Sequence, residues 1–143
     1  MNVGAAQAWF VAGTITLMIG GGLHALLSLM GTARYIVPRD HSVKSAMEGT
    51  RLQYGGSSAP SMWRAWLGFN ISHGLGAFTF GLLCLLIATH DFKLVEEIAA
   101  IRPLTIAVSA AYIVLSLRFW YYGPAIITGT ATACFTIATV LSA

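Results

Sequence analysis

The chain has 143 residues, of which 57% are hydrophobic and 9% charged, and a formal net charge of +3. Because soluble domains carry about 25% charged residues, this composition excludes a water-dispersed protein and predicts an integral membrane protein of one compact domain. The basic residues flank apolar runs instead of forming a patch with base-stacking aromatics. This argues against nucleic acid as a partner and leaves the lipid bilayer as the expected one.

The first apolar run, 9–30, has no charged residue over 22 positions. That length crosses a hydrocarbon core of about 30 Å. The run is longer than the usual signal-peptide core of about 7–15 residues, and no Lys or Arg precedes it. We therefore expect a retained transmembrane helix.

A polar stretch, 31–62, follows and forms the one substantial loop. Within it, 40–52 is predicted to be a short surface helix. Asp40 with Lys44 and Lys44 with Glu48 are opposite charges four residues apart, a spacing that supports exposed helices.

Three further apolar runs, 65–89, 103–122 and 124–142, complete the chain. Pro103 would occupy the first helical position, and Gly123-Pro124 would form a tight hairpin. The predicted fold class is all-α: a single-domain (1–143) polytopic membrane protein whose four transmembrane helices form an antiparallel bundle. Cys84 and Cys134 lie inside apolar runs and are expected to be buried and free.

Basic residues predict the orientation. With 31–62 in the cytoplasm, six basic residues lie inside and two outside, as the positive-inside rule prefers. We therefore expect both termini to be external and 31–62 cytoplasmic. The six inner basic residues are Arg34, Arg39, Lys44, Arg51, Arg64 and Arg118, and the two outer ones are Lys93 and Arg102. Tyr35 is among the aromatic residues expected at the inner interface.

Small and polar residues recur at steps of three or four along each span and are predicted to mark the faces where helices meet. The predicted contact residues are Gly13, Thr16, Gly20, His24 and Ser28; Asn70, His73, Ala77, Gly81, Cys84 and Ala88; Thr105, Ser109, Tyr112 and Ser116; and Thr128, Thr132, Thr136 and Thr139.

Two histidines stand out because polar side chains are costly in hydrocarbon. His24 and His73 both lie about 10 Å from the predicted inner ends of their helices, which run antiparallel. Asn70 is one turn from His73, and Tyr112 falls near the same level. The predicted ligand-binding residues are therefore His24, Asn70, His73 and Tyr112, with Arg118 a weaker candidate.

Three interpretations of this cluster stay open. The side chains bond only to other helices, or they bind a small hydrophobic ligand such as a quinone or a lipid headgroup, or the two histidines ligate haem iron or another metal. No carboxylate or thiol lies at this level to complete a closed zinc site, so no metal ligand is assigned. The cofactor is unknown, with haem left open.

No catalytic residue is assigned. All five acidic residues, Asp40, Glu48, Asp91, Glu96 and Glu97, lie in loops or at helix ends, and no G-x-S-x-G or H-E-x-x-H motif occurs. We expect a non-enzymatic protein that binds a ligand inside the membrane, in the cytoplasmic half of the bundle. The alternatives are an accessory subunit of a larger membrane complex, a small membrane enzyme acting on a lipid or quinone, and a bis-His haem protein.

One block carries a resemblance: Trp63-x-x-Trp66-x-Gly68-Phe69-Asn70-x-Ser72-His73-x-x-Gly76. It resembles the signature of an uncharacterised family of small four-helix bacterial membrane proteins. The resemblance implies the four-helix fold and a bacterial inner membrane, and it implies no activity or ligand.

Overall fold

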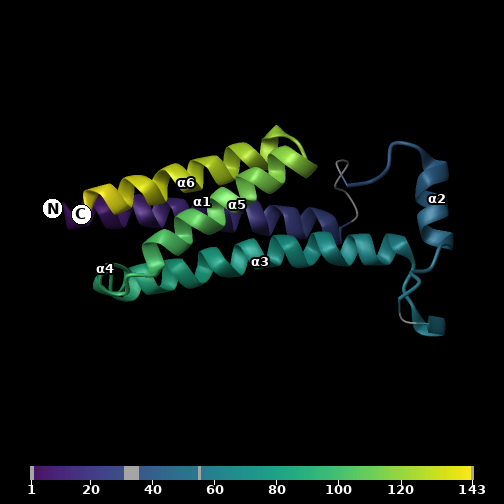
Figure 1. Cartoon of the computed structure of the whole chain (residues 1–143), viewed down its shortest axis with the longest axis horizontal. Coiled ribbons are helices and arrows are strands. Elements are labelled where there is room, and N and C mark those ends of the chain that lie inside the picture. The colour runs from purple at the N-terminus through teal and green to yellow at the C-terminus, as the bar shows by residue number, and fades with distance from the viewer. Residues whose placement is uncertain (1, 31–35, 55, 143) are drawn as a thin grey trace. The chain divides into compact units, whose positions relative to one another are not determined.

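The computed structural model describes residues 2–30, 36–54 and 56–142, and the regular elements among them are all helices, with no strand (Figure 1). Arg34 and Tyr35 lie outside the described residues. The helices are α1 (Val3–Leu29), α2 (His41–Gly49), η1 (Gly56–Ser58), α3 (Met62–His90), α4 (Lys93–Glu97), α5 (Ile101–Phe119) and α6 (Tyr122–Leu141).

Four of these helices, α1, α3, α5 and α6, are long and apolar enough to span a membrane. The all-helical class and the number of candidate spans are thereby confirmed. Each of the four matches a predicted apolar run in position, although the ends differ by up to six residues.

The largest consequence of the shifted ends is at the connection between α5 and α6. The predicted Gly123-Pro124 hairpin is wrong, because Trp120 and Tyr121 connect the helices and Pro124 lies in the first turn of α6. Pro103 likewise occupies the third position of α5 instead of the first. The first four N–H groups of a helix have no intrahelical acceptor, so proline anywhere in this turn loses no hydrogen bond.

The chain divides into two compact units. The terminal unit comprises Met1–Gly20 and Ala77–Ala143, and the loop unit comprises Gly21–Gly76. Helices α1 and α3 are each divided between the two units, so that each helix contributes one segment to the terminal unit and one to the loop unit. The single-domain assignment of 1–143 stays a prediction.

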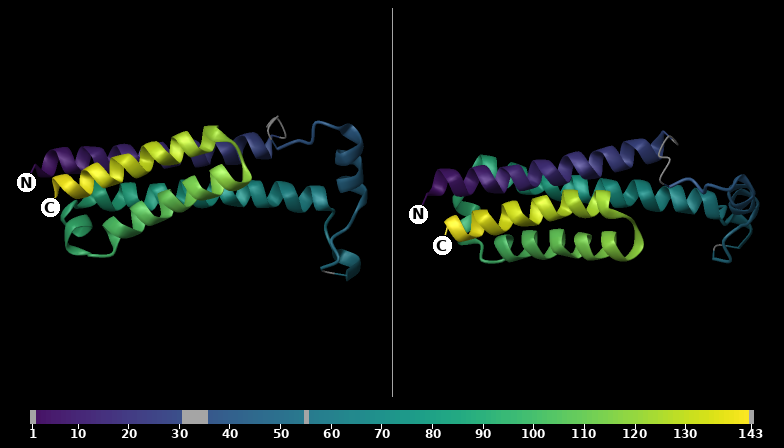
Figure 2. Two further views of the ribbon diagram at one scale, coloured as in Figure 1. Left: turned by 45° about the horizontal axis from the view of Figure 1, so that its top comes forward. Right: turned by 90° about the horizontal axis from the view of Figure 1, so that it is seen from above.

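A continuous apolar core holds the terminal unit together. Phe10 on α1 packs against Phe92 and Phe135, with ring centroids 6.0 Å and 5.2 Å away. Helices α5 and α6 lie side by side and antiparallel (Figures 1 and 2). Both cysteines are free and buried, as predicted. The core comprises Ala6, Phe10, Leu17, Cys84, Ala88, Phe92, Val95, Ala131, Phe135 and Ala138.

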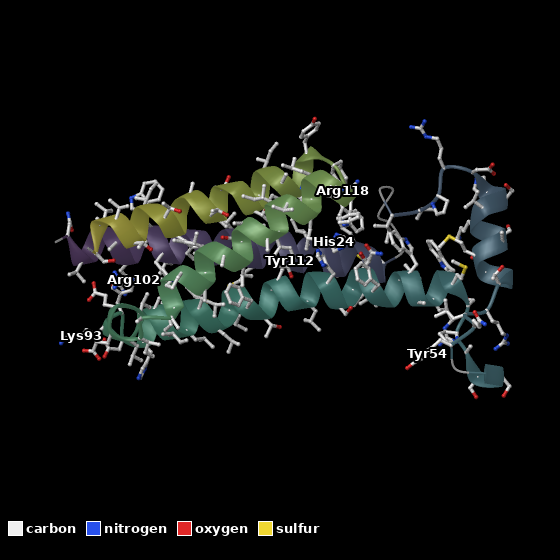
Figure 3. All side chains as sticks on the ribbon, viewed as in Figure 1. His24, Tyr54, Lys93, Arg102, Tyr112 and Arg118 are labelled. Atoms are coloured by element: carbon white, nitrogen blue, oxygen red, sulfur yellow. The ribbon has the colours of Figure 1, made fainter. Side chains whose placement is uncertain are left out.

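Polar contacts between elements gather at one end of the terminal unit, where α4 joins α3 to α5. Gln7 Nε2 donates to Ala88 O at 2.8 Å, and Arg102 Nη1 donates to Ser142 Oγ at 3.0 Å. Arg102 also donates to Glu96 O at 3.3 Å. Figure 3 shows Arg102 and Lys93 at this end and Arg118 at the opposite end of α5.

The predicted contact face of α6 is correct only in part. Thr128 is buried as predicted, whereas Thr136 is exposed, and the other buried residues of this helix are Ala131, Cys134, Phe135 and Ala138. The threonine hydroxyls also bond within α6 instead of across helices: Thr132 Oγ1 donates to Thr128 O and Thr136 Oγ1 to Thr132 O, both at 2.8 Å. A hydroxyl that bonds the carbonyl one turn earlier needs no neighbouring helix.

In the loop unit, α2 forms within the predicted surface segment and has no buried residue. Asp40 caps it, because its carboxylate accepts the Ser42 amide at 2.8 Å. Hydrogen bonding with Ser42 lowers the pKa of the Asp40 carboxyl. Of the two charge pairs predicted along this helix, Lys44–Glu48 is formed at 3.5 Å.

The chain between α2 and α3 closes on itself. Leu52 N donates to Pro60 O at 3.1 Å, and Met62 N donates to Thr50 O at 2.9 Å. Gly56 allows the reversal, since its φ of +60° lies in the left-handed region. These hydrogen bonds join the two ends of the closed loop, residues 50–62, of which the structure describes 50–54 and 56–62, at the start of α3.

Candidate functional site

The loop unit brings His24 on α1 and His73 on α3 into contact. Their ring centroids are 5.7 Å apart and the rings meet edge to face, at an interplanar angle of 78°. Both side chains are half-buried. Figure 3 labels His24 on its helix. Two residues 49 positions apart in the sequence thus form one imidazole pair.

Asn70 lies one turn before His73 on α3 and is fully buried. Its Nδ2 donates to Trp66 O at 2.8 Å, one turn earlier on the same helix. Its carboxamide also lies close to the His24 imidazole. Asn70 is therefore placed beside both histidines, where α1 and α3 meet.

A close approach of two backbones positions this pair. A Cβ atom on Gly74 would lie 2.6 Å from Ala25 N and 2.7 Å from Gly21 O. Real Cβ atoms do not come this close to backbone atoms, so only glycine fits here. Since Gly74 follows His73 directly, this contact fixes where the His73 side chain leaves α3 relative to α1. Residue spacing did not identify Gly74 or Gly21, although the run Gly20-Gly21-Gly22 was a visible signal.

Aromatic rings continue from the histidine pair along α3. Phe69 stacks on His73, with ring centroids 5.9 Å apart and an interplanar angle of 26°. Trp66 stacks on Phe69 at 6.3 Å and 21°, and its Nε1 donates to Ile36 O at 2.9 Å. Phe69 is 54% exposed, so an accessible aromatic side chain adjoins the imidazoles. The prediction missed this role for Phe69, although residues three and four apart on a helix are neighbours.

Tyr112, the fourth predicted site residue, lies on α5 in the terminal unit and is half-buried. Arg118 lies in the same unit, with its guanidinium 5.4 Å from the ring centroid of Phe119. The structure thus brings together His24, Asn70 and His73. Convergence of Tyr112 or Arg118 with them stays a prediction.

The side chains of the cluster are groups that can both donate and accept hydrogen bonds. A neutral imidazole offers one donor and one acceptor, and a carboxamide offers both. Within residues 2–30, 36–54 and 56–142, no group of three or more His, Cys, Asp or Glu side chains comes together to hold a metal ion. The described cluster suits recognition of a carbonyl or hydroxyl group.

Comparison with known proteins adds no identity: no family model, curated protein or solved structure matches this sequence.

Proposed function

We propose that α1, α3, α5 and α6 cross a membrane as an antiparallel bundle. α5, the shortest, has 19 residues and extends about 28 Å, close to the thickness of a hydrocarbon core. Large apolar side chains face outward along the four helices, including Leu23, Leu83 and Leu104, each more than half exposed. Contact with lipid accounts for this exposure, because a soluble protein rarely exposes so large an apolar surface to water.

We further propose a bacterial inner membrane, with the stretch 31–62 in the cytoplasm and both termini external. The six-to-two distribution of basic residues supports this orientation, and the motif around Trp66 and His73 resembles that of bacterial membrane proteins. In the terminal unit, α1 begins and α6 ends at the same end (Figure 2), which agrees with termini on one side.

Cysteine labelling tests the orientation. In a variant without Cys84 and Cys134, a cysteine at Ser45 in α2 should be protected from a membrane-impermeant maleimide in intact cells and labelled after lysis. Cysteines at Asn2 and Glu97 should be labelled in intact cells, since positive charge retained on the cytoplasmic side predicts them outside. Labelling of Ser45→Cys in intact cells would reverse the orientation.

The function that this geometry supports best is binding of a small apolar ligand that carries a carbonyl or hydroxyl group. The observation that carries this proposal is the contact of His24 and His73 beside the fully buried Asn70. In an apolar segment such polar groups are costly unless they have partners, and they mark functional sites.

The aromatic stack narrows the ligand class. Phe69 stacks with both Trp66 and His73 and is still 54% exposed, so a flat ring can pack against the exposed part of its side chain. A ring with carbonyl groups, as in a quinone, would combine this contact with hydrogen bonds to the imidazoles. The cluster acts here as a binding site, with His24 and His73 contacting the polar group and Asn70 holding His24.

Three variants test this function: His24→Gln, His73→Gln and the double substitution. Each single change should weaken binding at least tenfold, about 1.4 kcal/mol, and the double variant should lose little more because either change already dismantles the shared site. The measurement combines mass spectrometry of small molecules retained in native-lipid nanodiscs, titration with decylubiquinone, and thermal stability.

Ser72→Ala is the matched control. Ser72 adjoins His73 but is exposed, and its Oγ donates to Phe69 O of its own helix at 3.0 Å, so ligand retention should be unchanged. Stable histidine variants that hold every copurifying molecule at wild-type occupancy would show that the histidines serve packing alone.

A further inference from the structure

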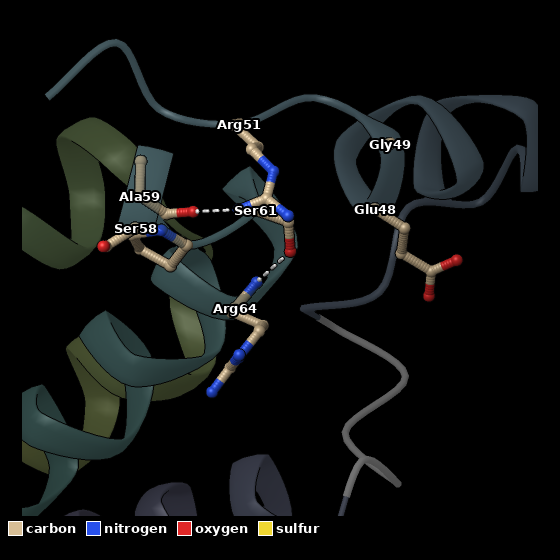
Figure 4. Close-up of a pocket in the computed structure, with 8 residues that line it drawn as sticks. Glu48, Gly49, Arg51, Ser58, Ala59, Ser61 and Arg64 are labelled. Carbon is tan, nitrogen blue, oxygen red and sulfur yellow. Dashed lines mark hydrogen bonds between the residues drawn. The ribbon is translucent and has the colours of Figure 1, made fainter. Parts of the chain in front are cut away.

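A second site lies at the start of α3, apart from the histidine pair. It is a surface cavity of about 410 Å³ between the end of α2, the closed loop and the first turn of α3 (Figure 4). Its lining includes two arginines, Arg51 and Arg64, and one acidic residue, Glu48. The remaining lining residues are small or polar.

The closed loop shapes one wall of this cavity, and Arg51 is part of that wall. Arg51 Nη1 donates to Ala59 O at 3.0 Å and to Ser57 O at 3.3 Å. A guanidinium has five N–H donors on three nitrogens, and both of these bonds to described residues use Nη1. Arg51 is thus held in place, and no described residue accepts from its Nε or Nη2, whose donors can bind a ligand.

Arg64 provides a second positive charge, and no described acidic residue forms an ion pair with it. Among the residues that the structure describes, its guanidinium makes no hydrogen bond or ion pair; only its backbone N–H is bonded, to Ser61 Oγ at 3.3 Å. Arg64 also lies in the first turn of the 29-residue α3, where aligned peptide dipoles add positive potential.

The acidic residue does not cancel this charge. The Glu48 carboxylate pairs with Lys44 at 3.5 Å, and in Figure 4 it points away from both arginines. Lys44 itself lies over the Trp63 ring, 5.3 Å from its centroid. The cavity therefore has a net positive lining next to an aromatic residue of the kind found at membrane interfaces.

We propose that this cavity binds a phosphate group through Arg51 and Arg64. Arginine pairs with phosphate in a bidentate geometry. Two sources share this chemistry: the headgroup of an anionic phospholipid, and a free phosphate or phosphate ester. The lipid source rests on the membrane insertion proposed above, since basic clusters beside a transmembrane helix attract anionic lipids. Binding of free phosphate does not depend on it.

The test measures binding to the full chain by native mass spectrometry in detergent. Phosphatidylglycerol, phosphatidylcholine and inorganic pyrophosphate are the probes, and the variants are Arg51→Gln, Arg64→Gln and Arg39→Gln. Arg39 is the matched control, an exposed arginine of the same polar stretch that does not line the cavity. Arg64→Gln keeps the test valid if Arg51→Gln disturbs the loop, since no hydrogen bond of the loop uses the Arg64 side chain.

A phosphate site predicts that Arg64→Gln weakens phosphatidylglycerol binding about tenfold while Arg39→Gln changes it less than threefold, because the lost hydrogen bonds are charge-assisted. Tight phosphatidylglycerol binding without pyrophosphate binding identifies a lipid headgroup, and pyrophosphate binding with the same sensitivity to Arg64→Gln identifies a soluble ligand. Equal losses in Arg39→Gln and Arg64→Gln, or no probe bound more tightly than phosphatidylcholine, would overturn the site.

Discussion

Gly74→Leu is expected to destabilise the loop unit by about 3 kcal/mol, near the upper end of the usual cost of overpacking. The cost is high because the first added atom, Cβ, meets backbone: Ala25 N at 2.6 Å and Gly21 O at 2.7 Å. A flexible side chain could turn away, whereas these atoms move only if α1 and α3 separate. The measurement is the free energy of unfolding in mixed micelles, followed by circular dichroism.

The same helix supplies two matched controls. Nothing lies within 4 Å of a Cβ placed on Gly68 or on Gly76, so leucine at either position should cost little. Gly74→Leu should also reduce ligand retention, because separating the helices separates His24 from His73. Equal stability of the Gly74, Gly68 and Gly76 variants would mean that α1 and α3 do not approach at Gly74.

Phe135→Ala is expected to destabilise the terminal unit by about 3 kcal/mol, the lower end of the range for phenylalanine truncation in soluble cores. Phe135 is fully buried, and its ring lies 5.2 Å from that of Phe10 and fills the space beside Gly13. In the membrane proposed above, the cost would come from lost packing instead of transfer from water, because lipid is as apolar as the core.

Phe119→Ala is the control for this variant. Phe119 is 69% exposed, so its removal leaves no cavity inside the terminal unit. Thermal unfolding of the two variants under one detergent condition should separate them clearly. A Phe135 variant as stable as the Phe119 variant would place Phe135 outside the core and contradict the packing of α6 against α1.

The sequence alone was sufficient to predict that the helices exist and roughly where they lie. A long apolar run such as 9–30 has few ways to satisfy its backbone other than a helix, and the polar stretch 40–52, with charges four residues apart, predicted α2. These properties are local, so no knowledge of neighbouring helices was needed. The starts of α5 and α6 were less well predicted, because proline is tolerated throughout the first turn and does not mark its first residue.

The tertiary structure decided which faces and which polar groups meet. Gly20, Gly21 and Gly22 cover most of the circumference of α1, so spacing could not select Gly21 as the partner of Gly74. Repeated threonines on α6 resembled a contact face, yet their hydroxyls bond the preceding turn, and Phe135 takes the buried position. His24 and His73 were singled out from the sequence as polar residues in apolar runs. Their edge-to-face contact depends on how closely the backbones of α1 and α3 approach. That distance is set by the packing of the two helices together and cannot be derived from either helix alone.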